Sequence, residues 1–202
     1  MKIRLDECLV KKGLAGDLSL AKSLVMEGRV FLGQERLRLP STPVGVDAAL
    51  WLKPESPYVS RGGLKLARAL EEFPIELSGR VCMDIGSSTG GFTECMLKNG
   101  AKGVYSIDVG YGLLDWKLRQ DERVTVMERT NAKNLLPDLF PERASFASMD
   151  LSFISVKKVL PAALSCMEEG AELVILVKPQ FEAPRGQVGK GGIVRQRAVH
   201  EA

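Results

Sequence analysis

The sequence has one histidine, His200, and four dispersed cysteines in 202 residues. A structural zinc site needs about four cysteine or histidine ligands, and a catalytic triad needs a histidine to accept the nucleophile's proton. The cysteines, Cys8, Cys82, Cys95 and Cys166, form no C-x-x-C pair. We therefore expect no metal centre, no histidine-dependent nucleophile, and thiols that stay reduced as they do in the cytosol.

Long hydrophobic runs are also missing. The longest strongly apolar run, residues 173–177, is far shorter than the ~20 residues that cross a bilayer. Charged residues follow Met1 at once, where a secretory signal would become apolar. The sequence thus predicts a cytoplasmic protein without a membrane partner.

The positive charge is distributed unevenly. Residues 1–62 carry ten Lys and Arg against seven Asp and Glu, whereas residues 63–202 carry eighteen of each. A basic module beside a neutral one indicates a nucleic-acid partner. An ordinary solvated surface is an equally good interpretation of the charge alone.

The first sixty residues are typical of a small α+β unit. Residues 4–13 and 19–28 have helical apolar spacing, with Ser19 as the expected N-cap of the second helix. Residues 29–32 and 46–52 are expected to be strands. The prolines that follow predict a linker over residues 53–60.

The remainder alternates helical stretches with short apolar strands. The expected strands are 81–86, 104–108, 124–127, 145–150 and 172–178. This alternation predicts an open parallel sheet with helices on both faces. Ligands bind such sheets at the carboxyl ends of the strands, so the residues that follow each strand are the candidate site.

The first of these strands leads into the glycine-rich segment DIGSSTGGFT. It is not a dinucleotide fingerprint, because Ser88 replaces the second glycine, and it is not a triphosphate loop, because Phe92 replaces the lysine. The segment still suits close approach to a small ligand. The candidate binding residues are Asp84, Gly86, Ser87, Ser88, Gly90, Gly91, Phe92 and Thr93.

Asp108 ends the second strand about twenty residues beyond the glycines. An acid in that place can accept hydrogen bonds from both hydroxyls of a ribose. Asn131, after the third strand, could bind an adenine edge. Together these residues indicate a nucleoside cofactor, with a helix N-cap as the alternative role of Asp108.

Three further residues are candidates for catalysis. Asp150 ends the fourth strand and Lys178 the fifth, where partial burial of the lysine would suit it to proton abstraction. Lys65 lies between Arg61 and Arg68 in a basic stripe of one helix. The alternative for each lysine is a solvated surface charge.

Several segments carry a resemblance to known families. RLDECL and SLAKSLVMEGRVFLG resemble the S-four RNA-binding domain. SRGGLKL, DIGSSTGGFT, SIDVGYG, MDLSFIS and VKPQFE resemble, in order, the TlyA family of FtsJ-like ribosomal RNA 2′-O-ribose methyltransferases, sometimes labelled hemolysins. The resemblance implies an S-four-like domain and linker over residues 1–59 and a Rossmann-like S-adenosylmethionine-dependent methyltransferase domain over residues 60–202.

The resemblance also implies roles for individual residues. The family has a catalytic Lys-Asp-Lys-Glu set. By motif, its two lysines and its aspartate correspond to Lys65, Lys178 and Asp150 of this sequence, and its glutamate would lie beyond residue 202. We therefore expect a C-terminally truncated domain that lacks its last strands, and inactivity of this chain alone stays open. S-adenosyl-L-methionine is the implied cofactor, with no metal.

Ribosomal RNA and ribosomal subunits are the implied partners, with cytidines of the small or large subunit as targets. We expect residues 183–195 to order on RNA phosphates, or to be a plain flexible tail. Two other functions stay open: a non-catalytic RNA-binding protein that keeps a cofactor pocket, and a hemolysin-like activity. The expected RNA-binding residues are Arg4, Lys11, Lys12, Lys22, Arg29, Arg61, Arg68, Arg185 and Lys190.

Overall fold

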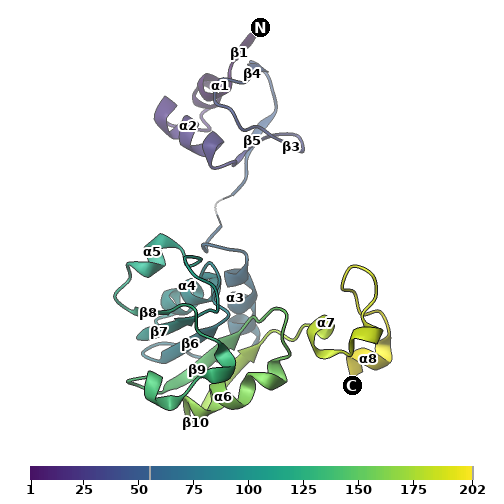
Figure 1. Cartoon of the computed structure of the whole chain (residues 1–202). Helices are drawn as coiled ribbons and strands as arrows, with labels where there is room; N and C mark the ends of the chain where they lie inside the picture. The colour runs from purple at the N-terminus through teal and green to yellow at the C-terminus, as the bar shows by residue number, and fades with distance from the viewer. Residues whose placement is uncertain (55, 202) are drawn as a thin grey trace. The chain divides into compact units, whose positions relative to one another are not determined.

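The computed structural model describes residues 1–54 and 56–201, which form two compact units (Figure 1). The first unit ends before Ser56, and the second begins there. None of the helices in these described residues is long and apolar enough to cross a bilayer.

The first unit combines two helices with two small antiparallel sheets. Its elements are β1 (Lys2–Arg4), α1 (Leu5–Lys11), α2 (Leu18–Met26), β2 (Val30–Leu32), β3 (Glu35–Arg36), β4 (Pro43–Gly45) and β5 (Leu50–Leu52). Strand β1 pairs with β4, and β2 lies between β3 and β5. This composition agrees with the α+β unit that the sequence pattern predicts.

Apolar residues of both helices form the core of this unit. Leu5 and Leu9 of α1 are fully buried with Val25 of α2. The helix cap expected at Ser19 is wrong. Helix α2 begins at Leu18, and the Asp17 side chain accepts a hydrogen bond from the backbone N–H of Leu20, because a carboxylate at that place satisfies a free amide of the first turn.

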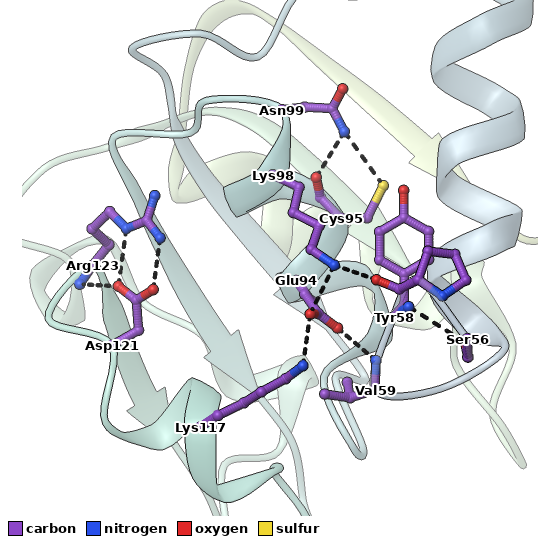
Figure 2. Close-up of polar contacts among 11 residues, drawn as sticks. Ser56, Tyr58, Val59, Glu94, Cys95, Lys98, Asn99, Lys117, Asp121 and Arg123 are labelled. Carbon is purple, nitrogen blue, oxygen red and sulfur yellow. Dashed lines mark hydrogen bonds and ion pairs between the residues drawn. The ribbon is translucent and has the colours of Figure 1, made fainter. Parts of the chain in front are cut away.

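The segment that opens the second unit is fixed to helix α4 (Gly91–Lys98) (Figure 2). Val59 donates its backbone N–H to Glu94 at 2.5 Å, and Lys98 and Lys117 lie 3.1 and 2.9 Å from the same carboxylate. Burial alone would raise the pKa of Glu94, but these three partners outweigh it and lower the pKa. The linker expected over residues 53–60 is therefore shorter, because its last residues pack on the second unit.

The second unit is a five-stranded parallel sheet covered by helices (Figure 1). The strand order is β10-β9-β6-β7-β8, and every pair of neighbours is parallel. The strands are β6 (Val81–Ile85), β7 (Gly103–Ile107), β8 (Val124–Met127), β9 (Ala144–Met149) and β10 (Met167–Ile175). The remaining helices are α3 (Gly62–Glu72), α5 (Trp116–Arg119), α6 (Leu160–Ser165), α7 (Pro179–Glu182) and α8 (Arg197–Glu201).

Both faces of this sheet are buried. Cys82 and Phe146 belong to the apolar cluster under α3 and α4, whereas their chain neighbours Met83 and Ala147 belong to a second cluster with Ala163 of α6. Successive strand residues point to opposite faces, so each strand supplies both clusters. The predicted parallel sheet with helices on both faces is confirmed. Its first strand, β6, lies in the centre, and the segments after β6, β7 and β9 meet at one edge.

Candidate active site

Two cavities lie side by side at the carboxyl edge of the sheet. The first has a volume of about 480 Å³ and the second about 430 Å³. Four residues line both cavities, namely Gly86, Ser88, Asp150 and Ser152. The two cavities therefore adjoin each other, with Asp150 among the residues that separate them.

The glycine-rich turn shapes the wall between the cavities. Gly86 has φ +87°, and a Cβ atom there would lie 3.0 Å from the carbonyl oxygen of Asp150. Ser88 also has a positive φ, of 49°, a conformation that costs little only for glycine. Its backbone N–H donates to Asp108 at 2.8 Å. The serine that breaks the dinucleotide fingerprint thus adopts the backbone that a glycine would favour, and Asp108 holds it there.

Asp84 is buried in the sheet and holds the turn from below. Its carboxylate accepts hydrogen bonds from the N–H and Oγ1 of Thr93, at 2.8 and 2.7 Å, and from Ser148 Oγ at 3.2 Å. Burial raises the pKa of Asp84 to about 6, although these hydrogen bonds act in the opposite direction. Asp84 lines the second cavity, but both of its carboxylate oxygens accept hydrogen bonds from other protein groups.

The structure places some of the expected binding residues away from the cavities. Thr93 is fully buried against Asp84, and Gly90 forms the left-handed N-cap of α4; neither lines a cavity. The tight turn uses both residues to begin the helix, and their contact with a ligand stays a prediction. Phe92 lines the second cavity from the apolar cluster under α3 and α4. Ser87 and Gly91 also line it.

The first cavity contains both residues that the sequence predicts to bind the ribose and base of a cofactor. Asp108 and Asn131 line it together with apolar residues such as Leu113 and Ile154. The cavity has a carboxylate for ribose hydroxyls, an amide for a base edge and apolar walls for the rings. The volume and this donor set fit an S-adenosylmethionine molecule.

Lys65, Asp150 and Lys178 come together in the second cavity. Lys65 Nζ donates to one carboxylate oxygen of Asp150 at 2.8 Å, and Lys178 Nζ lies 2.6 Å from the other. The three residues come from different elements: Lys65 from helix α3, Asp150 from the end of β9 and Lys178 from the start of α7. The three positions selected from strand ends and a helical stripe thus form one cluster.

The two lysines control the charge of Asp150. Burial alone would raise its pKa, but Lys178 and Lys65 lower it below the usual value. The role of Lys178 as a proton acceptor, expected from the sequence, stays a prediction.

The expected RNA-binding residues differ in their surroundings. Arg4 is paired with Asp6 at 2.7 Å, and Arg68 is paired with Glu71 at 3.1 Å. Arg61 is exposed and lines the second cavity. Arg29 is partly buried, and its guanidinium lies 3.7 Å from a carboxylate oxygen of a neighbouring glutamate. The others are exposed: Lys11, Lys12, Lys22, Arg185 and Lys190.

The structure adds residues that the sequence argument missed. Ser152 lines both cavities and accepts a hydrogen bond from Lys178 at 3.0 Å. Phe153 lines the first cavity, has φ +66° and is 92% exposed. Both belong to the MDLSFIS segment, whose polar and aromatic residues just after a buried strand were the available signal. Among the described residues, no group of three or more His, Cys, Asp or Glu side chains could hold a metal ion.

Comparison with known proteins places this site in a class. A family model described as FtsJ-like methyltransferase matches residues 58–202. The chain therefore belongs to the FtsJ-like methyltransferase family. The methyltransferase class and the resemblance to TlyA proteins, both inferred from the sequence, are confirmed.

Similar proteins carry more specific descriptions. A Bacillus subtilis protein described as an rRNA methyltransferase, YqxC, is 50% identical over 98% of this chain and 72% of its own length. The 16S/23S rRNA (cytidine-2′-O)-methyltransferase TlyA of Mycobacterium tuberculosis is 47% identical over 96% and 73%. A solved Streptococcus thermophilus structure described as a hemolysin is 48% identical, with a TM-score of 0.72 over 99% of this chain and 74% of that one.

Asp84 should give stability a measurable pH dependence. Because burial raises its pKa from 3.8 to about 6, its contribution to stability is present below pH 3.8 and is lost as the pH rises through 6. We expect the unfolding free energy of the wild type, relative to Asp84→Asn, to fall by about 2 kcal/mol between pH 4 and pH 7. Urea unfolding of both proteins across this range measures it, and a difference that stays constant with pH contradicts it.

Proposed function

We propose that this chain is an S-adenosylmethionine-dependent ribosomal RNA 2′-O-methyltransferase that acts on cytidine. The observation that carries the proposal is the Lys65–Asp150–Lys178 cluster, which lies where a nucleoside cavity meets a polar cavity. The relatives named for cytidine-2′-O-methylation support the choice of substrate.

S-adenosylmethionine supplies an electrophilic methyl group when it is bound. In our proposal Asp108 accepts hydrogen bonds from its ribose hydroxyls and Asn131 binds its base, both from the first cavity. The glycine-rich turn, with Gly86, lets the backbone approach the ligand closely. Water is kept from the reacting groups by the apolar wall that includes Leu113 and Ile154.

The target ribose enters the second cavity in this proposal. A ribose hydroxyl is a weak nucleophile at neutral pH and needs a base within hydrogen-bond distance. Lys178 first releases a proton to solvent and then accepts the hydroxyl proton, while Asp150 keeps the amine in place. Lys65 then faces the developing negative charge on the oxygen or the neighbouring phosphate. Positioning of the hydroxyl by this rigid cluster contributes the remainder of the rate.

The first unit supplies RNA affinity in this proposal, in keeping with its S-four-like sequence. Lys11, Lys12 and Lys22 are exposed and make no ion pair with other described residues. Exposed ammonium groups bind phosphates and release the counterions condensed on the RNA, which makes binding salt-dependent. Ribosomal RNA as substrate also implies a cytoplasmic location.

A non-catalytic RNA-binding role is the second candidate. It would leave the nucleoside cavity intact but make the Lys65–Asp150–Lys178 cluster unnecessary. The cluster favours the enzyme, because two lysines on one carboxylate serve no evident purpose in RNA binding alone.

Loss of the Asp108 carboxylate should weaken cofactor binding. Asp108→Asn keeps the side-chain volume but replaces one acceptor oxygen by a donor. We expect the affinity for S-adenosylmethionine, measured by calorimetry, to fall by about tenfold or more. Asp138→Asn, at an exposed position in a 3-10 turn, is the matched control. Equal affinity of Asp108→Asn and the wild type would remove Asp108 from the cofactor site.

Loss of any member of the catalytic cluster should abolish methylation. In the full-length protein, we expect Lys65→Ala, Asp150→Ala or Lys178→Ala to lower the rate by about a hundredfold or more, with cofactor affinity nearly unchanged. The assay is transfer of labelled methyl groups to unmethylated ribosomal subunits. Lys102→Ala, whose ion pair with Glu142 lies at the amino edge of β7, is the control. Full activity of a variant would remove that residue from the mechanism.

The exposed lysines of the first unit should control the salt dependence of RNA binding. We expect the double variant Lys11→Ala, Lys12→Ala to bind ribosomal RNA more weakly and to reduce the slope of log affinity against log salt by about 1 to 2. Titrations at several salt concentrations, with Lys102→Ala as control, measure the slope. An unchanged slope would place the RNA contacts elsewhere on the protein.

A further inference from the structure

Glu182 makes contacts that the catalytic scheme does not use. Its carboxylate accepts a hydrogen bond from Ser155 Oγ at 2.6 Å and another from the backbone N–H of Val156 at 2.8 Å. Both donors belong to the segment that follows strand β9, whereas Glu182 ends helix α7, which follows strand β10. The contact thus joins two segments that leave neighbouring strands.

These hydrogen bonds complete a series of contacts between the same two segments. Lys178 pairs with Asp150 and donates to Ser152, and the ring of Phe181 lies 5.3 Å from that of Phe153. Glu182 adds the next contact in the same direction along both segments. We define residues 150–156 as the β9 loop and residues 178–182 as the α7 segment.

The β9 loop needs an external support. Phe153 has φ +66° and is 92% exposed, a backbone conformation that costs free energy for a residue with a side chain. The loop nevertheless supplies Asp150 and Ser152 to both cavities and Ile154 to the first. Since strain at one residue persists only where neighbouring contacts oppose it, the hydrogen bonds at Ser155 and Val156 fix the far end of the loop.

We propose that Glu182 is a positioning residue for methyl transfer: it fixes the β9 loop against the α7 segment and thereby holds Asp150 and Ser152 at the distances from Lys178 that the reaction needs. This inference rests on the proposed function. Glu182 does not touch the cavities, so its effect passes through the loop and is not itself catalytic.

The test compares two substitutions in the full-length protein. Glu182→Ala removes both acceptor oxygens. Glu182→Gln keeps one oxygen for the Val156 N–H and offers an amide to Ser155, so it preserves the contact without the charge. Glu169→Ala, at an exposed position of β10, is the control for removing a glutamate.

Kinetics on unmethylated ribosomal subunits separate positioning from binding. We expect Glu182→Ala to lower kcat by about a hundredfold, because a displacement of about 1 Å at the reacting groups has that effect. The KM for S-adenosylmethionine should stay within twofold, and Glu182→Gln should recover most of kcat. A wild-type kcat in Glu182→Ala overturns the proposal, as does a Gln variant that is as impaired as Ala.

Hydrogen exchange tests the same contact without any substrate. In Glu182→Ala, the backbone amides of residues 151–156 should exchange hydrogen faster than in the wild type. In Glu182→Gln and Glu169→Ala, their exchange rates should equal those of the wild type. Unchanged exchange in Glu182→Ala overturns the proposal even if the enzyme is active. If the wild type methylates no ribosomal RNA, the proposed substrate fails, and the exchange measurement still decides whether Glu182 fixes the loop.

Discussion

The carboxylate of Asp150 between two lysine ammonium groups is the interaction on which the rest of the site depends. Each of its oxygens faces one lysine, at 2.8 Å for Lys65 and 2.6 Å for Lys178. Two lysines and one aspartate give the cluster a formal net positive charge. This charge suits an oxygen nucleophile or a phosphate but would repel a cationic group. Asp150 also lines both cavities.

The sheet keeps this cluster rigid. Strand β6 lies in its centre, with β7 and β9 on either side, and both faces are covered by apolar clusters. Asp84 on β6 holds the start of α4 through Thr93, and Asp108 after β7 holds the turn through Ser88. Three of the five strands therefore carry a carboxylate at or near their carboxyl ends: two fix the backbone of the turn, and the third, Asp150, faces the lysines.

Much of this arrangement could be predicted from the sequence. The five apolar strands and the intervening helices follow from residue patterns, and the polar residues that follow the strands mark the site edge. Less could be predicted about individual roles. Thr93 and Asp84 flank the glycines, and nothing local in the sequence shows that they are hydrogen-bonded to each other. Glu182 looks like a surface acid, because nothing local in K-P-Q-F-E shows that it meets Ser155.

The sequence by itself determined the parallel sheet, the order of its strands along the chain and the residue types at their ends, because hydrophobic periodicity and turn chemistry are local properties. Only the tertiary structure decided which of those residues meet. Lys65, Asp150 and Lys178 are separated by 85 and 28 positions in the chain, and their meeting depends on the pairing of β9 with both β6 and β10. Contacts of such separation come from the packing of whole elements, which no short sequence window contains.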